Sequence, residues 1–209
     1  MAKAYEINRD YKNARIWYNK SLAKGYKTDM ILTNIALLDI MESRWSEARE
    51  RLKQALEVNP NVSVAWSNLG TVAFMQGDYE QAKKYFMKAS AIDRFAMLPR
   101  LNLAKTLLKM GDAPSAIRAY DDILAIVPND ELILVNAIRA CWADHNGEKV
   151  ISLGKRLFSV SRNPETLTNV GIMMEYFSRR DLAAVAYQKA AAADSRYVKA
   201  RQLLERLGY

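Results

Sequence analysis

A repeat of 34 residues is the feature that most constrains what this chain can fold into. A small residue recurs at this spacing, at Ala14, Ala48, Ala82 and Ala116. A large apolar residue follows four positions after each of them, at Tyr18, Leu52, Phe86 and Tyr120. Because residues four apart lie on one face of an α-helix, each unit contains a helix with the same packing face. A fixed period of this length predicts stacked copies of one small helical unit.

A second helix precedes each of these helices. Its recurring positions are Leu32, Trp66 and Arg100, then Ile35, Leu69 and Leu103, then Ala36, Gly70 and Ala104. Gly77-Asp78 and Gly111-Asp112 lie between the two helices, where glycine ends the first helix and aspartate caps the second. Each unit is therefore predicted to be a pair of antiparallel helices. The apolar face that each pair leaves open requires the pairs to stack.

The unit at 63–96 resembles a tetratricopeptide repeat (TPR). The residues that match are Trp66, Leu69-Gly70, Gly77-Asp78-Tyr79, Ala82, Phe86 and Ala89. Units 29–62 and 97–130 match nearly as well, and unit 164–197 matches with an inter-helix turn that lacks glycine. Unit 131–163 is degenerate and one residue short. The resemblance implies an all-α fold, a right-handed α–α superhelix of about six helix-turn-helix repeats.

The resemblance covers almost the whole chain, so we expect a single TPR solenoid over residues 1–209. We expect a partial repeat at 1–28 and a capping helix with a polar outer face at 196–207. Because Met1 falls inside a repeat, we also expect that a further segment preceded it, with a signal peptide, a lipid anchor and an upstream domain as the alternatives. The expected location of the protein is the cytoplasm or the periplasm. A short array of this kind is similar to bacterial envelope TPR proteins that assist pilus assembly.

Composition argues against several kinds of chemistry. The chain has one cysteine, Cys141, and one histidine, His145, which excludes an internal disulfide framework and a histidine-rich metal site. No apolar run reaches the roughly 18 residues that a membrane helix needs. The sequence contains no nucleophile–base constellation and no metal-ligand spacing. We therefore expect a protein that is not an enzyme and that has no metal or other cofactor.

One polar residue recurs in the first helix of every unit. These residues are Asn34, Asn68, Asn102, Asn136 and Asn169, and the last interval is one residue shorter, as is the degenerate unit. Asparagine is unfavourable inside a helix because its side chain competes with the backbone for hydrogen bonds. A primary amide both donates and accepts, so a row of amides can hold the backbone of a peptide. This row resembles the asparagine ladders in the TPR superhelix of O-linked N-acetylglucosamine transferases and in importin-type solenoids.

The neighbouring positions complete a predicted peptide-binding groove on the concave side, which the first helices of TPR units line. One turn beyond the amides lie Leu37, Thr71, Lys105, Arg139 and Ile172. A further turn on lie Ile40, Phe74, Leu108, Trp142 and Glu175. From these we predict Thr71, Lys105, Arg139, Phe74 and Trp142 as groove residues, suited to a ligand with apolar and some acidic side chains. The alternatives are amides that bond locally between helices and apolar residues that pack between repeats.

The first hypothesis for function is a protein-interaction scaffold that binds a peptide or protein segment. The carboxylate clamp of chaperone-tail adaptors is not expected, because only Asn68 matches it and its cationic positions are occupied by Thr33, Leu98 and Asn102. The second hypothesis is a substrate-recruiting region of a larger enzyme, such as a glycosyltransferase. The third is a nucleic-acid-binding repeat. It is disfavoured because the net charge of +8 resides at residues 1–28 and 149–209 without one dense basic run.

Overall fold

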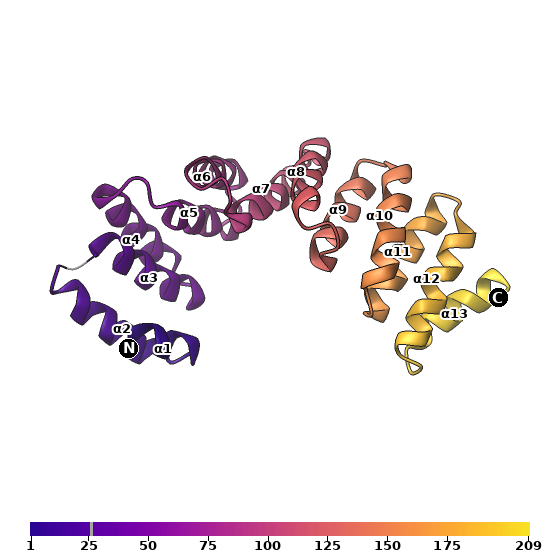
Figure 1. Cartoon of the computed structure of the whole chain (residues 1–209), viewed down its shortest axis with the longest axis horizontal. Coiled ribbons are helices and arrows are strands. Elements are labelled where there is room, and N and C mark those ends of the chain that lie inside the picture. The colour runs from indigo at the N-terminus through magenta and orange to yellow at the C-terminus, as the bar shows by residue number, and fades with distance from the viewer. Residues whose placement is uncertain (26) are drawn as a thin grey trace. The chain divides into compact units, whose positions relative to one another are not determined.

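A computed structural model describes residues 1–25 and 27–209. In this part of the chain all regular secondary structure is α-helical, and no strand occurs (Figure 1). The helices fall into two compact units, Met1–Thr106 and Leu107–Tyr209. The expected all-helical fold is confirmed. Tyr26, which falls in the predicted partial repeat at 1–28, lies outside the described residues.

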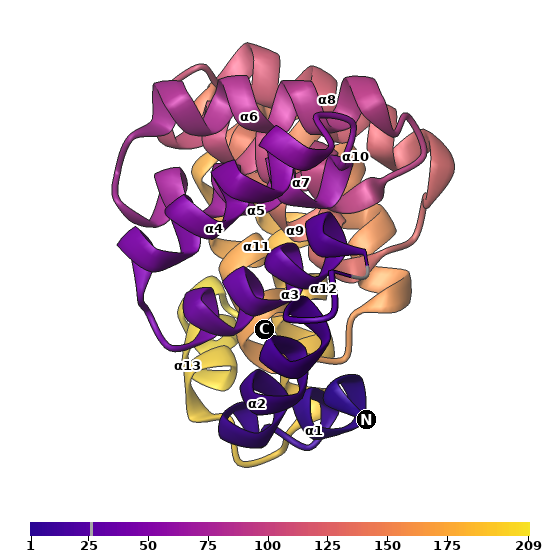
Figure 2. The same ribbon diagram turned by 90° about the vertical axis from the view of Figure 1, so that its left-hand side faces the viewer.

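Helices pack in consecutive pairs within each unit (Figure 1, and Figure 2 after a quarter turn). The first unit contains α1 (Ala2–Ile7), α2 (Tyr11–Leu22), α3 (Thr28–Met41), α4 (Trp45–Val58), α5 (Ser63–Met75), α6 (Tyr79–Ile92) and the start of α7 (Met97–Lys109). The second contains the rest of α7, then α8 (Ala113–Ile126), α9 (Glu131–Ala143), α10 (Gly147–Val160), α11 (Pro164–Tyr176), α12 (Arg180–Ala193) and α13 (Val198–Leu207). The helix α13 packs on α12 and α11, as expected of a cap, and it begins two residues later than predicted.

The turns inside the pairs follow the predicted chemistry. The side chain of Asp78 accepts a hydrogen bond from the backbone N–H of Gln81 at 3.1 Å and so caps α6. Gly77 precedes it with a φ of 80°, the left-handed conformation that glycine adopts at low cost. In the two turns of the second unit that lack glycine at this point, His145 (φ 53°) and Ser178 (φ 60°) take the same conformation. The turn geometry is therefore kept even where the sequence signal is lost.

Close contact between the two helices of a pair depends on the small residues of the repeat. A methyl group built on Gly70 of α5 would lie 2.6 Å from the ring of Phe86 on α6. Gly171 of α11 and Tyr187 of α12 form the same contact in the last pair, at 2.5 Å. Both rings are buried, so the large residue of the second helix fills the space that the small residue of the first helix leaves.

The degenerate unit uses its glycine differently. Gly154 lies in the middle of α10, where the other units have a large residue. A methyl group there would lie 2.3 Å from Cε of Met174 and 3.1 Å from Cγ1 of Val170, both on α11. The helix also buries Val150 and Leu157 completely. Gly154 therefore allows α11 to pack closely against α10, although glycine in a helix interior costs about 1 kcal/mol relative to alanine.

A carboxylate and a tyrosine pair across the first and last helix pairs of the chain. The hydroxyl of Tyr18 donates to Glu6 at 2.7 Å, and that of Tyr187 donates to Glu175 at 3.0 Å. Burial, and then the hydrogen bond to the glutamate, raise the pKa of both tyrosines. In the 97–130 unit, Leu108 stands at the glutamate position. There the hydroxyl of Tyr120 is buried with no hydrogen-bond partner among residues 1–25 and 27–209, and burial raises its pKa to about 12.

This difference predicts opposite effects of removing the two hydroxyls. We expect Tyr187→Phe to lower the free energy of unfolding by about 1–2 kcal/mol, because it removes a hydrogen bond to a charged group. Tyr120→Phe is the matched control, and we expect it to be neutral or stabilising by up to about 1 kcal/mol, because it removes an unsatisfied buried oxygen. Urea unfolding of the two variants measures both values. Equal losses would show that the bond to Glu175 contributes nothing specific.

A buried carboxylate joins three helices of the first unit. Asp39 of α3 is fully buried and pairs with Arg51 of α4 at 2.6 Å and with Arg15 of α2 at 2.9 Å. Arg44, in the turn before α4, reaches it through Nε at 3.0 Å. Glu42 adds ion pairs to Arg15 and Arg44. The repeat pattern does not predict this network, and its one signal is an aspartate inside an apolar helix.

Candidate peptide-binding groove

The five asparagines lie where the repeat pattern predicts them, on the first helix of each pair. Asn34, Asn68 and Asn102 belong to the first unit, and Asn136 and Asn169 to the second; all five side chains are partly buried. The amide nitrogens of Asn68 and Asn136 are buried and have no hydrogen-bond partner in the described structure. A buried donor of this kind is costly unless a water molecule or a ligand accepts from it. At these two positions the hydrogen-bonding capacity of the amide nitrogen is unused within the described residues.

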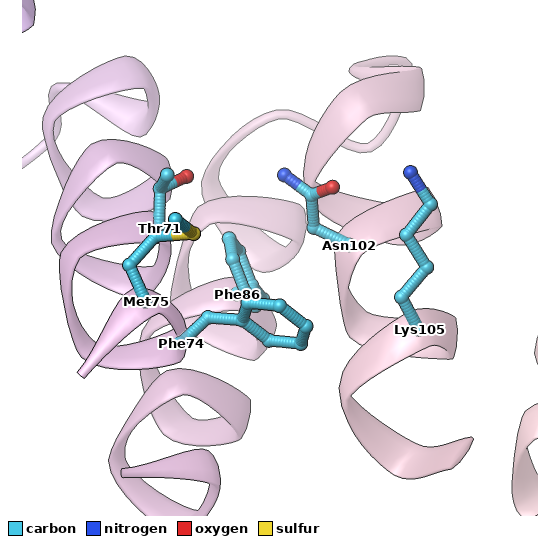
Figure 3. A pocket seen from close by; sticks show the side chains of 6 residues that line it. All are labelled: Thr71, Phe74, Met75, Phe86, Asn102 and Lys105. Carbon is cyan, nitrogen blue, oxygen red and sulfur yellow. The ribbon is translucent and has the colours of Figure 1, made fainter. Parts of the chain in front are cut away.

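A pocket of about 210 Å³ lies beside the amide row of the first unit. It is lined by Thr71, Phe74 and Met75 of α5, Phe86 of α6, and Asn102 and Lys105 of α7 (Figure 3). Four of these six residues are predicted groove residues: Thr71, Phe74, Asn102 and Lys105. In Figure 3 the polar ends of Thr71, Asn102 and Lys105 lie at one level, and the rings of Phe74 and Phe86 lie below them. The pocket is thus apolar at its base and polar along its rim.

The rim groups differ in how far they are already engaged. The hydroxyl of Thr71 donates to the backbone oxygen of Ser67 at 3.2 Å, within its own helix. Lys105 takes part in no ion pair among residues 1–25 and 27–209. The base is fixed, since Phe86 is buried against Gly70. The pocket therefore combines a rigid apolar base with an ammonium group that can pair with a carboxylate.

The predicted groove residues of the second unit are arranged differently. Arg139 and Asn169 line a hollow of about 30 Å³ between α9 and α11. This volume accommodates a water molecule but no large side chain. Trp142 lies in an aromatic cluster, with its ring centroid 4.7 Å from that of Tyr176 and 5.5 Å from that of Phe177. The second unit therefore presents a shallower surface at these positions.

Sequence reasoning missed two kinds of residue on this surface. Met75 and Phe86 line the pocket, although the repeat pattern assigns Phe86 to packing alone. Exposed apolar residues also recur on the first helices four positions before the asparagines, at Met30, Val64, Leu98 and Leu132. The signal that could have found them is the same 34-residue register.

No cluster of histidine, cysteine, aspartate and glutamate suited to a metal occurs among the described residues. Cys141 is buried, and burial raises the pKa of its thiol to about 11, which disfavours the reactive thiolate. His145 lies exposed in a turn. In the described part of the chain, no helix is both long enough and apolar enough to cross a membrane.

Residues 28–129 belong to the tetratricopeptide repeat family, whose model matches 28–95 and 61–129. Proteins of this family are generally scaffolds for protein–protein interactions. The family assignment agrees with the helix pairs and with the residues that fill the space between them.

Two characterised relatives are distant. The type IV pilus assembly protein PilF of Pseudomonas aeruginosa is 28% identical over 179 residues, which is 84% of this chain and 64% of PilF. The anaphase-promoting complex subunit 3 of Schizosaccharomyces pombe is 22% identical over 126 residues, which is 60% of this chain and 19% of that protein. The chain thus spans less than two thirds of either relative.

Solved structures agree with the fold. The structure of P. aeruginosa PilF has a TM-score of 0.77 at 16% identity, covering 98% of this chain and 94% of that one. YrrB, described as a TPR protein with an unusual peptide-binding site, has a TM-score of 0.72 at 17% identity, covering 88% of this chain and 96% of that one. At such identities the likeness establishes the fold alone.

Proposed function

We propose that this chain is a non-enzymatic scaffold that binds a peptide or protein segment along the first helices of its repeats. The observation that carries the proposal is the pocket of about 210 Å³, which brings together Thr71, Phe74, Asn102 and Lys105. These residues were predicted as groove residues from the repeat register, independently of any pocket. A concave apolar site with a few polar groups on its rim is the usual form of a ligand site.

Affinity in this proposal comes from two sources. Apolar side chains of the partner bury surface against Phe74 and Met75, at about 25 cal/mol per Å². The amides of Asn68 and Asn102 pair with the partner's backbone, and the unsatisfied amide nitrogen of Asn68 supports this role. Lys105, and Arg139 in the second unit, favour acidic partners. The amide row therefore supplies binding that depends little on sequence, and the neighbouring side chains add the preference.

A role in assembling a larger complex is the form of this function that the relatives support. PilF, which this chain resembles over most of its length, is named for type IV pilus assembly. A substrate-recruiting region of a larger protein is the second candidate. The observation in its favour is that the chain spans only 19% of the anaphase-promoting complex subunit it matches.

The amide row is tested by replacing Asn68 and Asn102 with alanine together. We expect capture of the physiological partner to fall at least about tenfold, because two backbone contacts of about 1 kcal/mol each are lost. The melting temperature should not fall, because the amide nitrogen of Asn68 has no hydrogen-bond partner among the described residues and alanine is the better helix former at both positions. Capture is measured by quantitative pull-down with the purified chain, and melting by circular dichroism.

The matched control replaces Asn19 and Asn129, which are exposed asparagines outside the row. We expect this variant to retain full capture. If the Asn68 and Asn102 variant instead melts earlier and still captures its partner, the amides are structural and the proposed role of the row is wrong.

A further inference from the structure

The exposed faces of the first helices in the first unit are apolar on both sides of the amide row. On one side lie Met30, Val64 and Leu98, and on the other lie Met41 and Met75. These five side chains are between 47% and 61% exposed. The free face of a surface helix is normally polar. Apolar side chains that recur in register on this face, rather than singly, indicate a surface that a partner covers.

The spacing of the row limits the conformation of that partner. The helices α3 and α5 are in contact, and α5 and α7 line one pocket. Packed helices lie about 8–10 Å apart. Each first helix carries one asparagine, so a bound chain meets one amide about every 8–10 Å along its length.

Two extended conformations can be compared with this interval. A β-strand advances about 3.3 Å per residue and turns alternate residues to opposite faces. Three residues of a strand match the interval, but they present opposite faces to successive amides. A polyproline II chain advances about 3.1 Å per residue and has three residues per turn. Its residues therefore return to the same face every 9.3 Å or so, which matches both the interval and the one-sided row.

The charge on this face distinguishes its two ends. At the position one turn beyond the amides, α3 has Leu37, α5 has Thr71 and α7 has Lys105. Of these, only Lys105 is charged, and it takes part in no ion pair among the described residues. A partner side chain here gains most by carrying a carboxylate.

We infer that the partner segment adopts a polyproline II conformation. The inference rests on the spacing of the asparagines, on the exposed apolar side chains on both sides of the amide row, and on Lys105. The segment carries an apolar side chain at every third residue and a carboxylate where it crosses α7. One of the apolar side chains enters the pocket above Phe86. This inference rests on the proposed function and specifies the chemical class of the ligand for the same surface.

The test compares two fluorescein-labelled peptides of identical composition, made of leucine, proline, alanine and glutamate. In both, glutamate occupies each end. Both contain three leucines, which are spaced three residues apart in the first peptide and two residues apart in the second. We expect the full chain to bind the first peptide at least about tenfold more tightly in fluorescence anisotropy, because the first peptide alone presents its leucines to every helix of the row. Equal affinities, or a preference for the second peptide, would overturn the inference.

Lys105→Glu tests the position of the carboxylate. We expect it to weaken binding of the first peptide several-fold and to strengthen binding of a version with lysine at both ends. Lys84→Glu, at an exposed lysine of α6 outside the pocket, is the matched control and should change neither affinity. The same response in both variants would overturn the role given to Lys105.

Failure of this inference is distinguishable from failure of the proposed function. If neither peptide binds, but the physiological partner is lost from the variant lacking Asn68 and Asn102, the amide row is retained and the polyproline II ligand is rejected. If neither peptide binds and that variant also retains its partner, the binding role of the amide row and the polyproline II ligand are both rejected.

Discussion

Asp39→Ala is expected to lower the free energy of unfolding of the first unit by about 3 kcal/mol, or more if the arginines cannot reach water. The carboxylate is fully buried and pairs with arginines from α2, from α4 and from the turn between α3 and α4. Removing one partner of a buried ion pair leaves the other charges uncompensated, which costs about 3–5 kcal/mol. The lower end is expected here because Arg15, Arg44 and Arg51 are each partly exposed.

Urea unfolding measures the loss, and hydrogen exchange locates it. Faster exchange should be confined to α2, α3 and α4, because each helix pair of a repeat protein is stabilised by its neighbours. Glu42→Gln is the matched control, since Glu42 bonds to Arg15 and Arg44 but is partly exposed. We expect it to cost less than about 1 kcal/mol. If Asp39→Ala lies within about 0.5 kcal/mol of the unsubstituted chain, the network does not stabilise the stacking of these helices.

Asp39 also marks the limit of prediction from the repeat. Positions that recur every 34 residues predicted the helix pairs, the caps at Asp78 and Asp112, and the burial of Phe86. This prediction was possible because equivalent positions of each repeat pack in the same way and carry the same residue types. Asp39 forms ion pairs with arginines from three other segments, and this arrangement occurs once. A residue that does not recur at the 34-residue spacing cannot be predicted from that spacing. The network depends on how far the arginine side chains extend between helices of neighbouring pairs.

The groove was predictable to a similar extent. The register placed Thr71, Phe74, Asn102 and Lys105 on one surface, and these residues line one pocket. The depth of that pocket was not predictable, because it depends on how far the ring of Phe86 and the side chain of Met75 leave space between α5 and α7. For the same reason Arg139 and Asn169 occupy the corresponding register but border a hollow of only about 30 Å³. The repeat register predicts the direction in which a side chain points, whereas the neighbouring side chains determine the volume of the pocket beside it.

Gly70→Ala is expected to destabilise the chain by about 1–2 kcal/mol, because overpacking a well-packed contact forces side chains and backbone to shift. The added methyl group would lie 2.6 Å from two atoms of the Phe86 ring, which is 1% exposed, so the ring would have to shift from its packed position. Intrinsic helix propensity acts in the opposite direction, since alanine is favoured over glycine by about 1 kcal/mol inside a helix. A loss of stability would therefore show that the close approach of α5 and α6 outweighs helix propensity at this position.

The preceding repeat supplies the compensating change. At the same two positions it has Ala36 and Leu52, which are buried in one apolar cluster. We expect Gly70→Ala combined with Phe86→Leu to recover at least about 1 kcal/mol of the loss. The coupling arises because leucine removes the ring atoms that alanine contacts. A double-mutant cycle from urea unfolding gives this coupling energy, and additive losses would contradict it. Because Phe86 also forms the base of the pocket, the double variant should remain folded yet bind apolar ligands differently, which separates the packing role of this ring from its role in the groove.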